Sequence, residues 1–96
     1  MDLAQKNRQS QYSLNLAKGG LHLDLNEPLL AVAAFKLAAE EGDKLEGWRA
    51  EGMLAQTYRI MGLPAEALLH VRAALMIAPT RAQPALNQLR MQLEKR

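Results

Sequence analysis

Cysteine is absent from the sequence, which excludes disulfide bonds and thiolate metal sites. Aromatic residues make up only 4% of the chain, which disfavours a β-sandwich, because such a core needs aromatic and β-branched side chains. The most apolar stretch, residues 29–39, is interrupted by Lys36 and is far shorter than the ~20 residues of a membrane span. The first residues also lack the apolar segment of a signal peptide. These absences predict a soluble, cytoplasmic protein.

Alanine and leucine dominate what the sequence does contain. Apolar residues make up 49% of the 96 positions, and most of them are Ala or Leu. Small and unbranched apolar side chains favour closely packed helices. The length fits one domain, although so short a chain buries only about two-thirds of its unfolded surface. We therefore expect a single all-α domain, 1–96, of marginal stability.

Charge is unevenly distributed although the net charge is only +2. Residues 24–51 carry seven acidic and three basic residues, whereas residues 52–96 carry two acidic and six basic residues. An acidic and a basic surface on one small molecule can steer a charged partner or a second copy of the chain. The plainer interpretation is that these residues form solvated helix faces.

Helical periodicity is clearest in residues 48–79, where two apolar stripes flank the sequence Gly62-Leu63-Pro64. Gly ends a helix and Pro is favoured in the first turn of the next, so these stripes predict two antiparallel helices with a short connection. Pro79 ends the second helix, and Thr80 is expected to cap the next. The predicted core positions are Ala50, Leu54, Ala55, Tyr58 and Met61, then Ala67, Leu68, Val71, Ala74 and Leu75.

An earlier hairpin is less regular. Its first helix is predicted to bury a stripe formed by Leu14, Ala17, Leu21 and Leu25. A turn at residues 26–28 precedes a helix over 29–39 that is apolar on nearly every side and ends near residues 40–43. The strict alternation at residues 21–25 also fits a strand, but no second strand is present to pair with it.

The two ends of the chain are simpler. Residues 83–96 place Leu86, Leu89 and Leu93 on one face and predict a lone amphipathic helix. Residues 1–11 are mostly polar, and we expect a frayed or loose helical extension.

The second hairpin resembles the tetratricopeptide repeat, a pattern of roughly 34 residues. With Trp48 as the first position, the matching positions are Leu54, Ala55, Tyr58, Gly62, Ala67, Ala74 and Pro79. Two positions depart from the family, because Glu51 and Val71 stand where it usually has aromatic residues.

Residues 12–45 resemble the same pattern more weakly. Ala31, Phe35 and Ala38 reproduce the small–aromatic–small spacing of the second helix, and Gly19 falls on the small position of the first. Where the family has Leu, Tyr and Gly, this stretch has Lys18, His22 and Asn26. The resemblance divides the chain into an extension (1–11), a weak repeat (12–45), a clear repeat (48–81) and a capping helix (82–96).

The resemblance implies antiparallel hairpins stacked as a short right-handed α-α superhelix with a concave side. The concave residues would be Ser13, Leu16, Gly20 and Leu23, then Arg49, Gly52, Gln56 and Arg59, with Leu86 and Arg90 from the closing helix. This surface grades from apolar to basic, which suits an amphipathic helix or an extended peptide with some acidic character. Two plainer readings stand beside it: Leu16 and Leu23 pack against the N-terminal segment, and Trp48 covers the junction between repeats.

The resemblance therefore favours a protein–protein interaction module: an adaptor, a small chaperone or an assembly subunit. Repeat arrays usually need about three repeats for stability, so two repeats and a cap favour association with a partner or with a second copy as a homo-oligomer. In size and architecture the chain is similar to the short tetratricopeptide-like chaperones of bacterial secretion systems.

Other functions have less support. A nucleic-acid-binding accessory protein would use Arg49, Arg59, Arg72, Arg81, Arg90, Lys95 and Arg96, but the small net charge and scarce aromatics disfavour it. His22 and His70 are the only histidines, and Asp24 alone lies near either at a ligand-like spacing. The acidic stretch Glu40-Glu41-Gly42-Asp43 is typical of a solvated helix end. We predict no enzyme activity, no metal and no cofactor.

Overall fold

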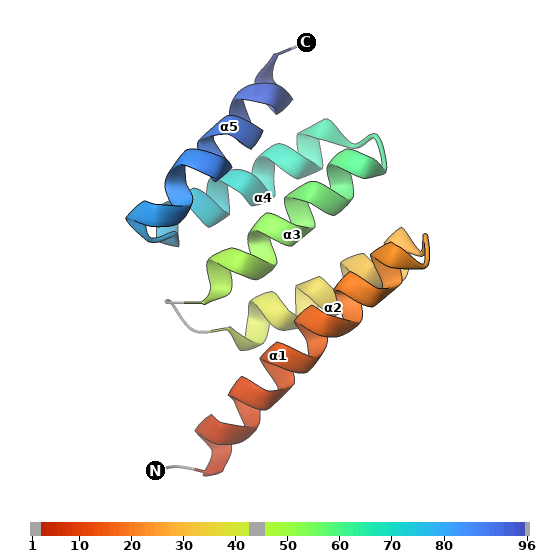
Figure 1. The fold of residues 1–96 in the computed structure, drawn as a ribbon, viewed down its shortest axis with the longest axis vertical. Coiled ribbons are helices and arrows are strands. Elements are labelled where there is room, and N and C mark those ends of the chain that lie inside the picture. The colour runs from red at the N-terminus through yellow and green to blue at the C-terminus, as the bar shows by residue number, and fades with distance from the viewer. Residues whose placement is uncertain (1–2, 43–45, 96) are drawn as a thin grey trace.

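A computed structural model of the chain describes residues 3–42 and 46–95, and these residues form helices and no strand. The elements are α1 (Leu3–Asp24), α2 (Pro28–Glu41), α3 (Gly47–Ile60), α4 (Pro64–Ile77), a short 3₁₀ helix η1 (Thr80–Ala82) and α5 (Gln83–Glu94). Each α-helix packs against its neighbours in the chain, and the two termini lie at opposite ends of the long axis (Figure 1). The predicted all-α fold of stacked antiparallel hairpins is confirmed, and the alternative strand at residues 21–25 is excluded, since this segment continues α1.

Both hairpins turn with the same backbone conformation. Asn26 and Gly62 adopt positive φ angles of 60° and 77°, in the left-handed region that glycine and, less readily, asparagine tolerate. A proline follows two residues later in each turn, Pro28 and Pro64, and occupies the first turn of the second helix. Asparagine therefore replaces glycine in the first turn without changing the connection.

The correspondence extends through both hairpins at an interval of 36 positions. α2 and α4 have the same length, and both end in an extended residue whose backbone N–H donates to the last turn, Gly42 to Ala38 and Ala78 to Ala74. Phe35 and Val71 occupy equivalent buried sites. The first four α-helices are therefore two copies of one structural unit, and α5 begins where a third unit would begin.

Small residues line the centre of the stack, as the sequence indicates. Ala31, Ala38, Ala55, Ala67 and Ala74 are fully buried. Their short side chains let neighbouring helices approach closely. The main core also takes in the bulkier Phe35, Leu54, Tyr58 and Val71 and the three leucines predicted for the last helix, Leu86, Leu89 and Leu93.

The prediction of which face of the first helix is buried is wrong. Leu14, Leu21 and Leu25 are 47, 56 and 59% exposed, and Ala17 is exposed between them. α1 instead buries the opposite face, which carries Tyr12, Asn15 and Gly19. The reason is steric: the ring of Phe35 lies directly over Gly19, so this face of α1 is the one that approaches α2 most closely.

Further differences concern the helix ends and the surroundings of α2. α2 is buried against α1 and α3, but Leu29 on its outer side is 73% exposed. Thr80 does not cap α5, because it begins η1 and Ala82 takes the cap position without a side-chain hydrogen bond.

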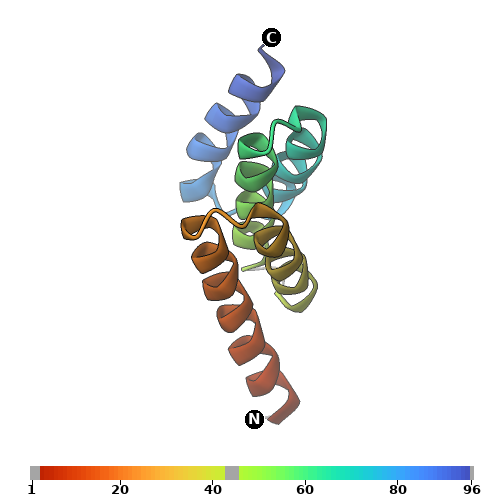
Figure 2. The same ribbon diagram turned by 90° about the vertical axis from the view of Figure 1, so that its right-hand side faces the viewer.

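The backbone is helical from Leu3, so α1 is much longer than α3 and extends beyond α2 (Figure 2). Among the helices just described, none has the length and apolar character needed to cross a bilayer.

Candidate partner-binding groove

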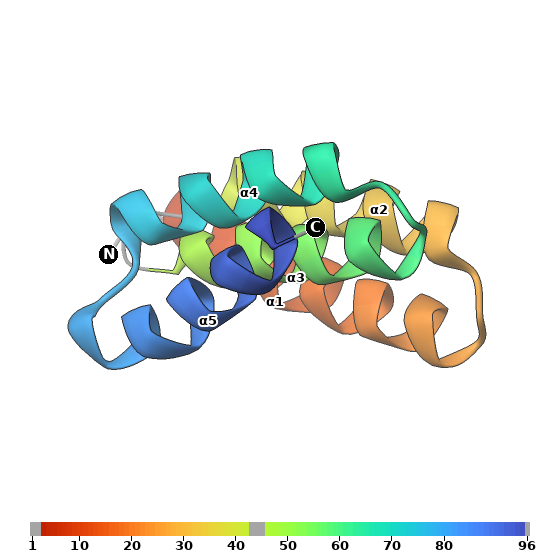
Figure 3. The same cartoon turned by 90° about the horizontal axis from the view of Figure 1, so that it is seen from above.

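The helices form two layers, and one layer is hollowed. α2 and α4 lie on one side of the stack, while α1 and α5 lie on the other with α3 between them (Figure 3). A groove of about 450 Å³ opens between α1 and α5, with α3 as its floor. Its lining residues are Leu16, Phe35, Trp48, Arg49, Gly52, Met53, Gln56, Ala85, Leu86 and Leu89.

The floor of the groove is low because Gly52 has no side chain. A Cβ atom at Gly52 would lie 3.5 Å from Cδ2 of Leu86, an ordinary contact distance that leaves room for substitution. Leu16 from α1 and Leu86 from α5 form the two walls, and Phe35 reaches in from α2. Apolar side chains therefore surround a backbone surface that a partner can approach closely.

Half of the predicted concave residues meet in this groove. Leu16, Arg49, Gly52, Gln56 and Leu86 come from three different helices and line one hollow. Leu16 also packs against both clusters of the core, so it is a wall of the groove and not a free side chain.

The other predicted residues lie outside the groove. Ser13 is exposed, Gly20 faces open space, and Leu23 is half-buried against the main core. Arg59 is exposed near the end of α3, where its guanidinium donates to Oε1 of Gln56 at 3.1 and 3.3 Å. Of the predicted basic residues, Arg49 therefore lines the groove, whereas Arg59 lies outside it on the same helix.

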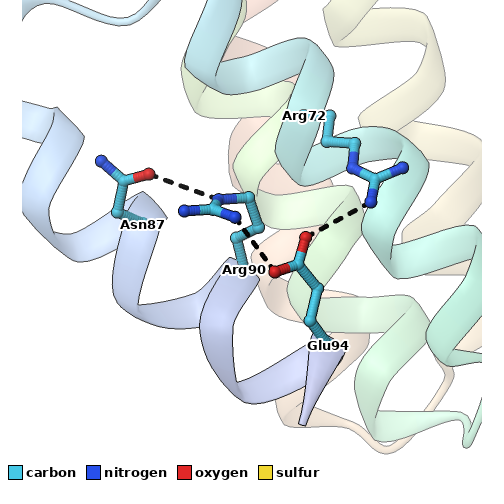
Figure 4. A network of polar contacts seen from close by, with 4 residues as sticks. All are labelled: Arg72, Asn87, Arg90 and Glu94. Carbon is cyan, nitrogen blue, oxygen red and sulfur yellow. Dashed lines mark hydrogen bonds and ion pairs between the residues drawn. The ribbon is translucent and has the colours of Figure 1, made fainter.

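Arg90 is held at the edge of α5 by a small polar network (Figure 4). Its guanidinium donates to Oε1 of Glu94 at 3.0 Å and to Oδ1 of Asn87 at 3.4 Å. Arg72 on α4 donates to Oε2 of Glu94 at 3.3 Å. The hydrogen bond from Arg72 is the main cause that lowers the pKa of Glu94, and the charge and hydrogen bond of Arg90 act in the same direction against desolvation. Glu94 therefore joins α5 to α4 through Arg72, and Arg90 is held along α5 by its bonds to Asn87 and Glu94.

Trp48 was predicted to cover the junction between the two repeats, and it also lines the groove. Trp48 is half-buried and packs against the core at the start of α3, as a cover for the hairpin junction would, but it also lines the groove. The guanidinium carbon of Arg49 lies 5.5 Å from the centre of the Trp48 ring, within cation–π range. The Nε of Arg49 also lies 3.2 Å from Oε2 of Glu46.

The concave prediction missed Phe35, Met53, Ala85 and Leu89. Phe35 was matched to the aromatic position of the repeat and Leu89 to the apolar face of the last helix, and both residues belong to the core and also line the groove. No sequence signal distinguishes a core side chain that also borders a hollow, because that depends on the separation of α1 and α5.

The histidines lie in carboxylate pairs away from the groove. Nδ1 of His22 is 2.9 Å from Oε1 of Glu27, and Nδ1 of His70 is 2.9 Å from Oε1 of Glu51. His70 also stacks on Tyr58, with ring centres 5.4 Å apart. Within residues 3–42 and 46–95, no group of three or more His, Asp or Glu side chains is arranged to hold a metal ion.

No protein-family model, no curated protein and no solved structure matches this chain. The resemblance to the tetratricopeptide repeat therefore stays a prediction.

Proposed function

We propose that the chain is a tetratricopeptide-like interaction module, an adaptor or small chaperone, that binds an amphipathic helix of a partner protein. The observation that carries the proposal is the open apolar groove between α1 and α5, floored by the glycine surface at Gly52. Burial of apolar surface is the main driving force for such association. A row of apolar side chains on one face of a helix is the shape that such a groove accepts.

Charges near the groove favour an acidic flank on that helix. Arg49 lines the groove and Arg59 lies on the same helix, both with exposed side chains. Arg49 forms an ion pair with Glu46, which partly neutralises the guanidinium charge but leaves other N–H groups of Arg49 able to donate. A carboxylate on the bound helix would compete with Glu46 for the guanidinium. Electrostatic complementarity of this kind sets orientation and association rate more than affinity.

Nucleic-acid binding is the weaker candidate. Glu94 engages both Arg72 and Arg90, and Glu46 engages Arg49, so these cations already have carboxylate partners. The described arginines of this alternative come from four elements: Arg49 and Arg59 from α3, Arg72 from α4, Arg81 from η1 and Arg90 from α5. Binding to single-stranded nucleic acid at low salt, lost steeply as salt rises, is the result that would favour this alternative.

The lack of cysteine fits the reducing cytoplasm, where we propose that the protein acts.

The groove provides its own reporter for a binding experiment. Trp48 is the only tryptophan of the chain and lines the groove, so its fluorescence responds to occupancy. The probe is a synthetic amphipathic helix of Leu, Ala and Glu, and its counterpart carries Lys in place of Glu. We expect the acidic helix to change Trp48 emission in a saturable manner and to bind more tightly than the basic one.

Two glycine variants separate groove binding from other contacts. Gly52→Gln places a side chain on the floor of the groove and should abolish the fluorescence titration. Gly20→Gln also replaces a helical glycine with a better helix former, but Gly20 does not line the groove, so binding should remain. If neither helix binds the native chain, or if Gly52→Gln binds as the native chain does, the proposed function is wrong.

A further inference from the structure

The outer side of the first hairpin is an apolar surface that no described helix covers. Leu14, Leu21 and Leu25 on α1 are about half exposed, as are Leu30 and Leu37 on α2, at 51 and 50%. We call these five leucines, together with Ala17, the end face. Single exposed leucines are ordinary on protein surfaces, but a continuous group of this size usually marks an interface.

The helical wheel places the end face away from α3. On α1, Leu14 and Leu21 lie on the side opposite Tyr12 and Gly19, which pack toward α2 and α3. On α2, Leu30 and Leu37 are exposed, whereas Val32 and Phe35 join the main core formed with α3. The end face is therefore the free end of the helical stack and lies apart from the groove.

The two hairpins correspond at an interval of 36 positions, so the end-face positions of α1 can be compared with the equivalent positions of α3. The equivalents of Leu14 and Leu21 on α3 are Ala50 and Thr57, and both are fully buried. Ala50 belongs to the cluster formed with Tyr12 and Ala38 of the first hairpin. In the second hairpin these positions make the contact with the hairpin before it. On α1, the end face therefore occupies the positions of this contact surface and carries leucines in place of Ala50 and Thr57.

The pattern on α1 is suited to a second copy of itself. Leu14 and Leu21 lie three residues before and four residues after Ala17, on one helical face. In an antiparallel pair of α1 helices that cross near Ala17, Leu14 of each copy would meet Leu21 of the other. The small side chain at the crossing point permits close approach of the two helices. A two-fold axis would then bring α2 of each copy together beside them.

The size of the surface fits a weak, reversible association. The end face spans residues 14–25 on α1 and 30–37 on α2, so at a rise of ~1.5 Å per residue and a helix width of ~10 Å it presents a footprint of roughly 300 Å². Two copies together cover roughly 600 Å², which is in the range of weak, transient interfaces.

We propose that the end face joins two copies of the chain in a two-fold dimer, with antiparallel α1 helices crossing at Ala17 and both grooves left open. This inference goes beyond the proposed function, because the end face and the groove share no residue. The dimer and the groove can therefore fail separately in experiment.

The first test is the molar mass in solution. Sedimentation equilibrium of the native chain from micromolar to millimolar concentration should show a monomer–dimer equilibrium. Leu21→Glu should weaken the dimer by a factor on the order of 100 or more, because it buries a charge without a partner. The matched control is Leu69→Glu on α4, where the leucine is 62% exposed but lies outside the end face. A native chain that stays monomeric throughout, or a dimer broken by Leu69→Glu and not by Leu21→Glu, overturns the proposal.

The second test locates the two-fold axis and does not depend on weakening the dimer. The chain has no cysteine, so Ala17→Cys introduces a unique thiol at the predicted crossing point. Mild oxidation should convert this variant into a covalent dimer, because paired Cα atoms in a disulfide lie about 4.4–6.8 Å apart. Ala65→Cys on the exposed side of α4 is the control and should remain mostly monomeric. Equal cross-linking of both variants contradicts the proposed geometry.

Salt separates this dimer from one formed by the acidic and basic halves of the chain. An apolar end face keeps its affinity when sodium chloride is raised, whereas attraction between exposed opposite charges is screened. A dimer that dissociates at high salt is therefore held by the charge blocks, and this result would also overturn the proposal.

Discussion

The ring of Phe35 on α2 occupies the space that a side chain at Gly19 on α1 would need. A Cβ atom built on Gly19 would overlap three carbon atoms of that ring, and both residues are buried. The absence of a side chain at Gly19 is thus what allows the two helices to approach. This contact also decides which face of α1 enters the core, and with it which face is left outside.

Gly19→Ala should destabilise the protein by about 1–3 kcal/mol, because the Phe35 ring must shift in a packed core. Gly20→Ala is the control, since its Cβ meets no atom within 4 Å and alanine is the better helix former. That change should stabilise the fold by about 0.5–1 kcal/mol. Urea unfolding followed by circular dichroism measures both changes. Equal effects of the two substitutions would contradict the close approach at Gly19.

The two hairpin turns allow a reciprocal exchange. Gly62→Ala should cost about 1 kcal/mol, because its φ of 77° lies in the left-handed region that a Cβ disfavours. Gly62→Asn should cost less, since Asn26 already adopts a φ of 60° at the equivalent turn. Asn26→Gly should in turn be nearly neutral. Thermal unfolding of the three variants should give this order, and a Gly62→Ala variant as stable as the native chain would show that the turn relaxes to another conformation.

The second hairpin was predictable because every signal in it agrees. Its apolar stripes have one register each, and the Gly-Leu-Pro turn fixes where the helices end. Of the five core positions predicted in its second helix, three are fully buried and two are partly buried against the core: Ala67, Val71 and Ala74, then Leu68 and Leu75. Local pattern and global packing point the same way there, so the sequence alone was sufficient.

The first helix was mispredicted because it carries apolar residues on opposite faces. Leu14 and Leu21 form one stripe, whereas Tyr12, Leu16 and Leu23 lie on the other side and face the core. Periodicity detects both stripes but cannot rank them. The choice is made by the fit of Gly19 under a ring on another helix, which no local pattern contains.

The predicted concave residues came from the resemblance to the tetratricopeptide repeat, which implies that the first helix of each hairpin and the closing helix share one side. Five of these residues line the groove. Arg90 was assigned to the same surface by its helical position. Its hydrogen bonds with Asn87 and Glu94, and the contact of Glu94 with Arg72, hold it at the α4 edge instead. Such side-chain pairing depends on the angle at which α5 docks.

Tyr12 joins the first helix to the entrance of the second hairpin. Its hydroxyl donates to the backbone carbonyl of Glu46, the residue that precedes α3, while its ring is buried against Ala38 and Ala50. Tyr12→Phe keeps the ring and removes the donor, so we expect a loss of about 1 kcal/mol in the free energy of unfolding. Tyr12→Ala should cost more, about 3–5 kcal/mol, because it also leaves a cavity. A Tyr12→Phe variant with unchanged stability would show that this hydrogen bond contributes nothing to joining the two hairpins.

The pKa of Glu94 offers a pH-dependent test of the link between α4 and α5 (Figure 4). The hydrogen bond from Arg72, and then the charge of Arg90, hold this pKa below its ordinary value in the folded chain. Because the folded pKa is lower than the unfolded one, ionised Glu94 favours the folded state above the unfolded pKa, and this contribution is lost as pH falls through the folded pKa. Carboxyl chemical shifts in an NMR titration measure the value directly. Arg72→Ala should raise the pKa of Glu94 toward the ordinary value, whereas Arg81→Ala, which removes an exposed cation outside the Glu94 network, should leave it unchanged. If the titration of Glu94 is the same in both variants, Arg72 does not hold α5 in the way described.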